Sequence, residues 1–449
     1  MSQTRSRGWL DRVSPGGGDA PDDPDTEAGH EAGEGVHAPL RVSEGGALRL
    51  SAAQRHRWGA TPGAEFDVEE TPEGIYLRRR EGALQRVYVE PTSRCNLACR
   101  TCVRHSWTEP TGTMSMETYG ALIDGLRAVP TLRAMAFWGF GEPLLHPQIA
   151  PMVDMAHGLG ARTEMISNGL LLDGAMAEAL VSAGLDSLVL SVDGASAEGY
   201  ADIRTGGALG RVLENVDRLR EIRAAAGRAT PEIGIEFVAM RRNLGELRHL
   251  PRLAQRMGAT RIVVTNVLPY TEELRDETLY GRWAGRSLQT HSSEWSPEIV
   301  LPRVDLHGET LAAFAGLLYD TGYAQTAALR PDEAGGHCRF VSEGALAVSW
   351  DGQVSPCVAL MHSYSCFVLG RAKQIRRYVL GSVAKRPVAE IWALPEYAAF
   401  RDRVRRFDFS PCTDCGGCDM VEANERDCVG NGFPVCGDCL WAKGVIHCP

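Results

Sequence analysis

Six short apolar segments recur along the middle of the chain, and each is followed by a longer stretch with helical periodicity. The apolar segments occupy residues 86–92, 133–140, 162–168, 187–193, 232–240 and 261–267. The amphipathic stretches occupy residues 115–127, 147–158, 173–183, 209–225 and 244–257. Near-continuous apolar, β-branched runs are typical of strands buried on both faces, and their alternation with helices predicts a parallel α/β sheet. Six such units predict a partial (β/α)6 barrel of the TIM type, with its functional residues at the carboxyl ends of the strands.

The segments on either side of this repeat follow different patterns. Residues 1–45 are rich in Gly, Pro, Asp and Glu, with too little apolar surface to offset the entropy of ordering, which predicts a disordered tail. Residues 46–82 alternate short β-like runs with turns, and the order of these elements resembles a small AbrB-like β-domain. That resemblance is compatible with a DNA-binding, docking or dimerisation module, and equally with a β-rich extension of the barrel. Residues 83–325 then form the predicted barrel, and residues 330–449 form a cysteine-rich domain.

Composition excludes some classes of protein. The 449-residue chain is 44% hydrophobic and 23% charged, which is ordinary for a globular protein. Its net charge of −10 argues against a general nucleic-acid binder, which needs a basic surface. No stretch approaches the roughly 18 apolar residues of a membrane helix, and the N-terminus has no export signal. We therefore expect a cytoplasmic protein that does not bind membranes.

The thirteen cysteines are unevenly distributed. Three lie within residues 95–102 and ten lie within residues 338–448, with none in the 235 residues between these two groups. In a reducing compartment, such clusters are typical of metal ligands rather than of disulfides.

The first group has the spacing Cys95-x3-Cys99-x2-Cys102 and directly follows the first predicted strand. A [4Fe–4S] cluster usually takes four thiolates, so three cysteines leave one iron open. A zinc loop would instead need a fourth ligand nearby. The spacing resembles the signature of the radical S-adenosylmethionine (SAM) superfamily. This resemblance implies that SAM binds the open iron and is cleaved reductively to a 5′-deoxyadenosyl radical.

Glycine-rich and polar residues end the following strands. Residues 138–143 resemble the Gly-Gly-Glu-Pro segment with which the superfamily binds the SAM amino group, although Phe140 takes the place of the first glycine. The resemblance implies further SAM contacts after the third and fourth strands, and an arginine that pairs with the SAM carboxylate. Each polar residue alone would equally fit a helix cap. The predicted SAM-binding residues are Gly139, Gly141, Glu142, Pro143, Ser167, Asn168, Ser191, Asp193 and Arg204.

The cysteine-rich region begins with Cys338, followed by Gly352-x4-Cys357, which resembles the opening of the SPASM domain. The later spacing departs from the pattern of that domain, so the pairing of ligands stays open. One or two auxiliary Fe–S clusters are expected, which either relay electrons or stabilise the domain, and structural zinc is the alternative. Cys366 is then a free buried thiol. The predicted ligands are Cys338, Cys357, Cys412, Cys415, Cys418, Cys428, Cys436, Cys439 and Cys448.

Residues 361–364, 404–411 and 427–449 resemble the tungsten cofactor oxidoreductase radical SAM maturases. This resemblance implies a maturase for an aldehyde ferredoxin oxidoreductase-like tungstoenzyme or its cofactor, with a ferredoxin or flavodoxin as electron donor. A peptide-modifying enzyme of the pyrroloquinoline-quinone or sulfatase-maturation type is an alternative, as is the pterin-forming step of molybdenum cofactor synthesis. A non-catalytic Fe–S electron carrier is a further alternative. The sequence identifies no catalytic acid or base.

Overall fold

The computed structural model divides into two parts, Met1–Pro62 and Gly63–Pro449. It describes residues 82–107, 109–281, 297–305, 307–319, 337–415 and 418–447. It also describes the backbone of residues 41–42, 48–49, 66–71, 74–79, 288–289 and 328–329. Most of the predicted tail over 1–45 and part of the predicted β-domain over 46–82 therefore lie outside the described residues.

Two antiparallel strand pairs occur in the N-terminal region. In the first part, β1 (Arg41–Val42) pairs with β2 (Leu48–Arg49). In the second part, β3 (Phe66–Thr71) pairs with β4 (Gly74–Arg79). The boundaries of this region and its relation to AbrB-like domains stay predictions.

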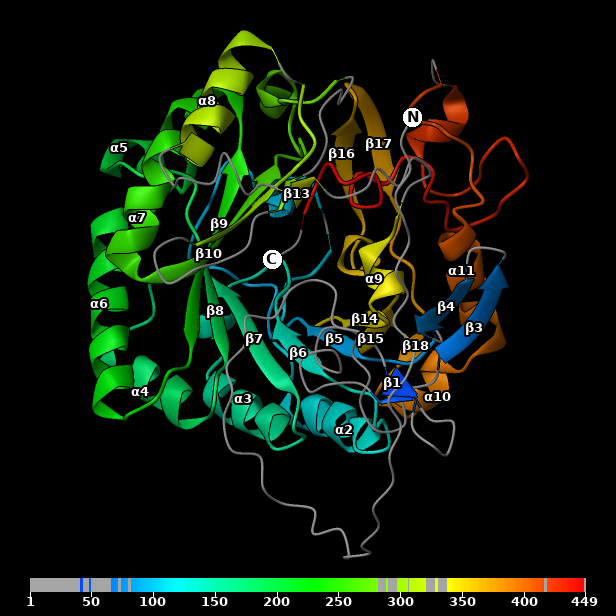
Figure 1. Cartoon of the computed structure of the whole chain (residues 1–449), viewed down its shortest axis with the longest axis horizontal. Helices are drawn as coiled ribbons and strands as arrows, with labels where there is room; N and C mark the ends of the chain where they lie inside the picture. The colour runs from blue at the N-terminus through cyan, green and yellow to red at the C-terminus, as the bar shows by residue number, and fades with distance from the viewer. Residues whose placement is uncertain are drawn as a thin grey trace, which may run out of the picture. The chain divides into compact units, whose positions relative to one another are not determined.

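A mixed sheet forms the centre of the second part, and its middle strands run in parallel (Figure 1). All six predicted strands belong to this sheet, in the order of the sequence. They are β5 (Arg86–Val89), β6 (Ala134–Phe137), β7 (Arg162–Ser167), β8 (Ser187–Ser191), β9 (Glu232–Ala239) and β10 (Ala259–Asn266). Beyond β10, the parallel strand β12 (Glu298–Leu301) is followed by two antiparallel strands, β11 (Leu288–Gln289) and β13 (Ala328–Leu329). The parallel α/β fold predicted from the sequence is confirmed.

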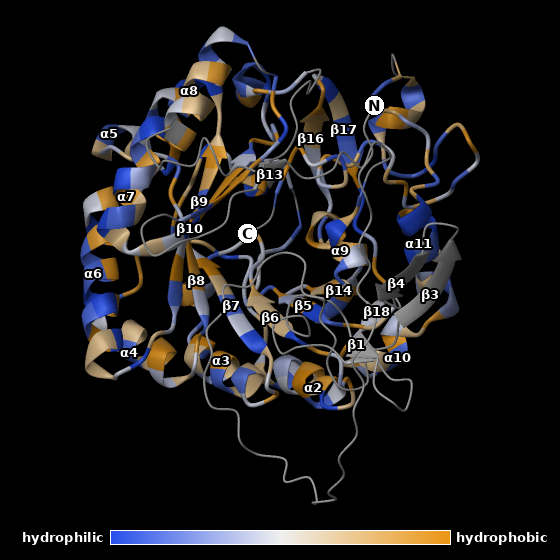
Figure 2. Cartoon of the chain, viewed as in Figure 1, coloured by the Kyte–Doolittle hydropathy of each residue, from blue (hydrophilic) through white to orange (hydrophobic). Residues whose placement is uncertain are grey.

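Helices cover the outer side of the parallel strands (Figure 1). They are α2 (Met116–Leu126), α3 (Ile149–His157), α4 (Gly174–Ser182), α5 (Ala197–Ile203), α6 (Leu209–Ala225) and α7 (Leu250–Met257). Hydrophobic and hydrophilic residues alternate along α6 and α7, whereas β9 and β10 are largely hydrophobic (Figure 2). The helical stretch predicted over residues 244–257 is present, but its first part belongs to a 3-10 helix, Arg241–His249, and only its second part is the α-helix α7. Pro251 lies in the first turn of α7 and has no amide hydrogen, so it cannot donate a helical hydrogen bond to a carbonyl of the preceding turn.

The cysteine-rich region extends the same sheet. The strand β14 (Ala345–Val348) pairs in parallel with β5, in the register Ala345 to Arg86. The strands β15 (Gln353–Ser355) and β18 (Gly381–Ser382) follow it on the same edge. The remaining elements are β16 (Tyr364–Val368), β17 (Arg371–Ile375), α8 (Gly308–Tyr319), α9 (Arg339–Ser342), α10 (Val388–Trp392) and α11 (Pro395–Arg406). The barrel and the cysteine-rich region thus share one sheet.

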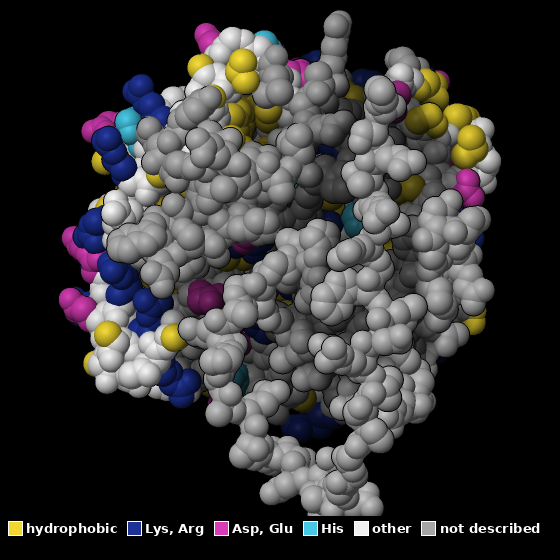
Figure 3. All heavy atoms as spheres, viewed as in Figure 1, with side chains coloured by type: hydrophobic (Ala, Val, Ile, Leu, Met, Phe, Trp, Pro, Cys, Tyr) yellow, Lys and Arg dark blue, Asp and Glu magenta, His cyan; other side chains and the backbone are white. Residues whose placement is uncertain are grey.

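The interior and the surface show the expected separation of side chains. One cluster of buried hydrophobic residues includes Val87 and Phe137 of the barrel strands and Val354 and Tyr397 of the cysteine-rich region. Along the edge formed by α6 and α7, basic and acidic side chains alternate (Figure 3), and Arg256 pairs there with Asp217. Among the described residues, no helix is long and apolar enough to cross a membrane.

Candidate active site

The three cysteines of the first motif lie on the loop that follows β5. The Cys102 amide donates to the Cys99 carbonyl at 3.1 Å, which forms a tight turn. Cys99 is buried, whereas Cys95 and Cys102 are partly exposed. Arg104 Nε lies 3.1 Å from the Cys102 sulfur, and the same guanidinium donates to the Leu97 carbonyl at 2.7 Å. The loop therefore presents three thiols, one of which has a cation beside it.

All three thiols line one cavity, which also contains most of the residues that the resemblance assigns to SAM. These residues follow β6, β7 and β8, whose carboxyl ends meet at the same edge of the parallel sheet. The predicted residues that line the cavity are Cys95, Cys99, Cys102, Gly139, Gly141, Ser167, Asn168, Ser191 and Arg204. Three of the predicted residues do not line the cavity, namely Glu142, Pro143 and Asp193.

The segment after β6 packs closely against the cysteine loop. A Cβ atom on Gly141 would lie 2.1 Å from the Thr92 carbonyl oxygen, so this close approach requires glycine. The buried Glu142 carboxylate accepts hydrogen bonds from the Ser167 hydroxyl and the Asn168 amide, both at 2.8 Å. Burial raises the pKa of Glu142, while these hydrogen bonds oppose the shift. Glu142 therefore positions the end of β7, and its contact with the SAM amino group stays a prediction.

Arg204 and Asp193 form a buried ion pair, with 2.7 Å between Arg204 Nε and Asp193 Oδ2. Burial acts to lower the pKa of Arg204, but Asp193, Cys99 and Tyr200 together outweigh this effect and raise the pKa. Arg204 Nη1 also lies 4.0 Å from the Cys99 sulfur. The guanidinium thus lies between Asp193 and the thiols, where it can bind a carboxylate ligand. Asp193 orients Arg204 and has no place on the cavity wall.

Glu236 is a potential acid–base residue that sequence reasoning missed. It pairs with Ser191 across β8 and β9, and the Ser191 hydroxyl donates to its carboxylate at 3.2 Å. Gly234 lies two residues earlier on the same face of β9 and lines a separate cavity between the barrel strands. Glu236 is only partly buried, and removal from bulk water raises its pKa to about 7. An acidic residue inside an otherwise apolar predicted strand was the available signal.

The end of β10 contacts the C-terminal segment. Asn266 Nδ2 donates to the Arg303 carbonyl at 2.8 Å and to the Val445 carbonyl at 2.7 Å. The Thr265 hydroxyl accepts from the His447 amide at 2.9 Å. The polar side chains at this strand end therefore hold residues that are distant in the sequence.

Five cysteines of the C-terminal region line another cavity, namely Cys338, Cys357, Cys366, Cys436 and Cys439. Burial raises the pKa of Cys436 well above its ordinary value, and Cys439, Cys338 and Cys357 add to this shift. For Cys366, burial raises the pKa to about 12, and Cys439 is the one cysteine that contributes. All five thiols therefore line one cavity, and the pKa of Cys436 responds to Cys439, Cys338 and Cys357 but not to Cys366.

The remaining predicted ligands lie elsewhere. Cys415, Cys418 and Cys428 are exposed, and Cys412 is partly exposed. Cys428 Sγ lies 2.9 Å from the Ser410 hydroxyl. Cys448 lies outside the described residues. Among the side chains that the structure describes, no three of His, Cys, Asp or Glu are close enough to hold a single metal ion.

Family models match both halves of this arrangement. The model of the radical SAM superfamily matches residues 89–225, and that of the SPASM iron-sulfur cluster-binding domain matches residues 338–419. A solved structure of native anSMEcpe with bound AdoMet shares the fold, with a TM-score of 0.51, 16% identity, and coverage of 75% of this chain and 88% of that one. The fold, the cysteine loop and these matches define a radical SAM enzyme with a SPASM region. Its cofactors are a [4Fe–4S] cluster and S-adenosylmethionine.

Within this class, the chain belongs to the family of the tungsten-containing aldehyde ferredoxin oxidoreductase cofactor-modifying protein of Pyrococcus furiosus. The two sequences are 30% identical over 370 residues, which is 82% of this chain and 97% of its relative. The PqqA peptide cyclase of Granulibacter bethesdensis is 27% identical over 353 residues, which is 78% of this chain and 83% of that protein. The family predicted from the sequence is confirmed, and the roles of individual site residues stay predictions.

Proposed function

We propose that this enzyme modifies a tungsten-containing, aldehyde ferredoxin oxidoreductase-like enzyme or its cofactor. The observation that carries this proposal is the 30% identity to the Pyrococcus cofactor-modifying protein over 97% of its length. Because the match extends over 82% of this chain, it supports shared chemistry as well as a shared fold.

The residues on the first cavity wall suit a cluster with one open iron. Cys95, Cys99 and Cys102 would supply three thiolates, and Arg104 would stabilise the charge on Cys102. Gly139 and Gly141 bring the backbone to the cavity, and Arg204 offers a cation to the SAM carboxylate. When bound, the cluster and SAM supply the 5′-deoxyadenosyl radical that abstracts a hydrogen atom from the substrate.

The second cysteine-lined cavity suits an auxiliary cluster. Cys338, Cys357, Cys436 and Cys439 would supply four thiolates, which leaves no open iron for a substrate or for SAM. A second auxiliary cluster would use Cys412, Cys415, Cys418 and Cys428, which are close in the sequence. We propose electron relay as the role of these clusters, with a ferredoxin or flavodoxin as the external donor.

A peptide substrate is the second candidate. The PqqA peptide cyclase covers 78% of this chain at 27% identity, so the same two regions also occur in a relative whose name denotes a peptide substrate. The two functions differ in what is modified, and they share the step in which SAM is cleaved.

Anaerobic protein with reconstituted clusters, reduced and given SAM, tests the common step. Formation of 5′-deoxyadenosine is expected, and its absence would overturn the proposal. Incubation with an apo tungstoenzyme, and separately with its isolated pterin cofactor, then tests the substrate by mass spectrometry of both. Iron analysis counts the clusters, because about twelve irons per chain would mean three four-iron clusters and about four irons would exclude auxiliary clusters.

A further inference from the structure

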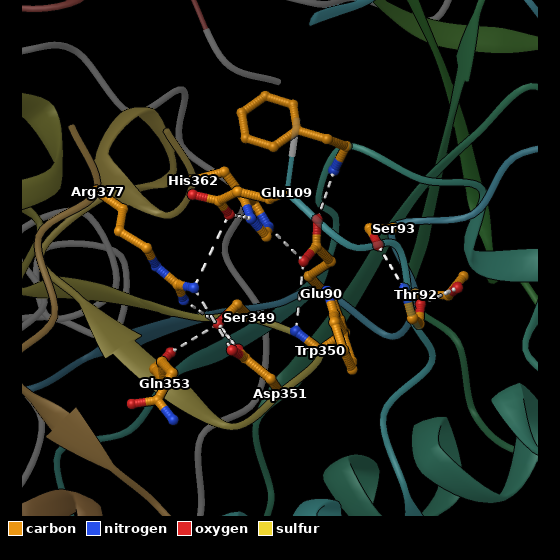
Figure 4. A network of polar contacts seen from close by, with 12 residues as sticks. Glu90, Thr92, Ser93, Glu109, Ser349, Trp350, Asp351, Gln353, His362 and Arg377 are labelled. Atoms are coloured by element: carbon orange, nitrogen blue, oxygen red, sulfur yellow. Dashed lines mark hydrogen bonds and ion pairs between the residues drawn. The ribbon is translucent and has the colours of Figure 1, made fainter. Parts of the chain in front are cut away.

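His362 belongs to the SPASM-matched region, and its side chain lies between two carboxylates (Figure 4). Its Nε2 lies 2.8 Å from Glu90 Oε2, and its Nδ1 lies 2.8 Å from Glu109 Oε2. Ionised carboxylates only accept hydrogen bonds, so two such partners require protons on both ring nitrogens. Burial alone would lower the pKa of His362, but the hydrogen bonds to Glu109 and Glu90 raise it to about 9. His362 is therefore an imidazolium at neutral pH.

Glu90 connects this cation to the segment after β6. Glu90 directly follows β5, is 0% exposed, and accepts a hydrogen bond from the Phe140 amide at 3.0 Å through Oε1. A Cβ atom on Gly139 would lie 2.4 Å from Glu90 Cγ, so the segment can lie against Glu90 only because this residue is glycine. Glu90 Oε2 also accepts from the Trp350 amide at 3.3 Å. The Glu90 carboxylate thus holds the backbone that brings Gly139 and Gly141 to the first cavity.

The other charges near His362 come from both regions of the chain. Glu109 accepts from the Ser363 amide at 2.8 Å, and Arg377 Nη1 lies 3.8 Å from Glu109 Oε2. Arg377 Nη1 also lies 3.5 Å from Asp351 Oδ2. The ring of Trp107 covers the imidazole at 4.5 Å between centroids. If His362 were neutral, Arg377 would be the cation that remains beside Glu109 and Asp351 among the residues that the structure describes.

We propose that His362 is a positioning residue for SAM, which acts by holding Glu90 in place and thereby the backbone of Gly139–Gly141. This inference rests on the proposed assignment of that segment to SAM. A side chain of the SPASM-matched region would then determine the shape of the SAM site through Glu90, which lies about 270 residues earlier in the sequence. SAM binding in the barrel would depend on the correct folding of the SPASM-matched region. Loss of His362 would leave the charge of the buried Glu90 carboxylate without its cation. Such a charge costs free energy, because it must be neutralised or rehydrated.

The test compares variants of the reconstituted holoenzyme by their affinity for SAM, which is followed by the change in the EPR spectrum of the reduced cluster. His362→Ala and Glu90→Gln are each expected to weaken SAM binding about tenfold, as is typical when a residue behind a ligand-binding group is removed. The double variant is expected to be no weaker than either single variant, because His362 acts through Glu90. Ser349→Ala is the matched control, since the hydroxyl of the buried Ser349 bonds to Arg377 and Asp351 rather than to Glu90. It is expected to bind SAM with wild-type affinity.

A pH series separates positioning from a purely structural role. In the wild type, the pKa of His362 is raised to about 9, so the imidazolium is present at neutral pH and is lost as the pH rises through about 9. SAM affinity should therefore fall in this range, by more than any change seen in His362→Ala. Glu109→Gln removes one of the two negative charges beside the imidazole and should move this midpoint to lower pH. The comparison of the wild type with Glu109→Gln does not require the His362 variant to fold.

The outcomes distinguish the two levels of proposal. A wild-type enzyme that neither binds nor cleaves SAM would overturn the proposed function. The positioning role alone would be overturned if the wild-type enzyme binds SAM and a folded His362→Ala variant binds it with the same affinity. It would also be overturned if Glu109→Gln leaves the midpoint of the pH dependence unchanged.

Discussion

The two cysteine-lined cavities of this enzyme are built from different surroundings. The first is lined by three thiols, of which Cys95 and Cys102 are partly exposed, together with Ser167, Asn168, Ser191 and Arg204. The second is lined by five thiols and many apolar side chains, among them Phe340 and Leu440. A cavity that must admit and release a polar ligand needs hydrogen-bonding groups and an open coordination position. A cavity that only holds a cluster needs four thiolates and shelter from water.

This difference assigns separate chemistry to the two regions. The first cavity has polar groups that suit the amino and carboxylate ends of SAM, and Ser191 on its wall donates a hydrogen bond to Glu236. The second cavity has Lys373 and Asp438 as its charged groups among the lining residues that the structure describes, and these pair with each other at 2.6 Å. The difference supports the proposal that substrate chemistry takes place in the barrel and that the cavity around Cys436 holds an auxiliary cluster.

The largest effect is expected from the loop of the first cavity. Replacing Cys95, Cys99 and Cys102 together with Ala should abolish 5′-deoxyadenosine formation, because no other group of thiols borders the predicted SAM residues in the described cavity. About four irons per chain should be lost, on the ligand count of one cluster. Persistence of the product, measured by chromatography, would contradict the assignment of this loop.

The second effect concerns the other cavity. Cys436→Ala with Cys439→Ala should also remove about four irons per chain. The variant should unfold at lower temperature, because metal binding supplies folding energy, while uncoupled 5′-deoxyadenosine formation should persist. Cys366→Ala is the matched control in the same cavity and should keep the wild-type iron content. An equal loss of iron in both variants would show that the proposed set of four ligands is wrong.

The third effect separates proton transfer from SAM cleavage. Glu236→Gln should slow product formation about 100-fold, the usual contribution of an acid–base residue, and leave uncoupled SAM cleavage unchanged. An equal decrease in both rates would instead indicate that Glu236 shapes the SAM site through Ser191.

The same carboxyl group should affect stability. Because burial raises the pKa of Glu236 to about 7, its contribution is fully present below the ordinary range near 4.5 and is lost as the pH rises through about 7. The wild type should therefore lose roughly 2 kcal/mol more than Glu236→Gln over this range, allowing for solvent inside the barrel. Denaturant unfolding of the two proteins at several pH values measures this difference, and parallel pH curves would contradict it.

The smallest effect concerns the reduction potential of the first cluster. Arg104→Ala removes a hydrogen bond to Cys102, worth about 1 kcal/mol, and should lower the potential by roughly 40 mV. Arg100→Ala is the control, because Arg100 lies on the same loop but pairs with Asp202 and Glu273. Redox titration monitored by EPR would measure both, and equal potentials in wild type and Arg104→Ala would show that the contact is without effect.

Several features could be predicted from the sequence because they depend on residues that are close in the chain. Strand and helix periodicity extends over 5 to 17 residues in elements such as β8 and α6, so the parallel barrel could be predicted. The cysteine loop spans eight residues, and its spacing alone indicates a cluster with an open iron. Pro251 shows the limit of this reasoning, since a periodic pattern did not reveal that the helix restarts there.

Other features could not be predicted because they join distant segments. Glu142 is held by the end of the next strand rather than exposed to the cavity. The pairing of β14 with β5 joins residues about 260 positions apart, and no local pattern specifies which strand edge is free. The meeting of Cys366, on β16, with four other cysteines at one cavity likewise depends on how β16 packs.

The sequence by itself determined the repeat of strands and helices and the two groups of cysteines, because local spacing and periodicity carry that information, and its short motifs resemble those of radical SAM enzymes. Only the tertiary structure decided which cysteines share a cavity, and that Glu90, Glu109 and His362 form one charged network. The physical reason is that hydrogen bonds and ion pairs act over about 3 Å in space, whatever the number of residues between the partners.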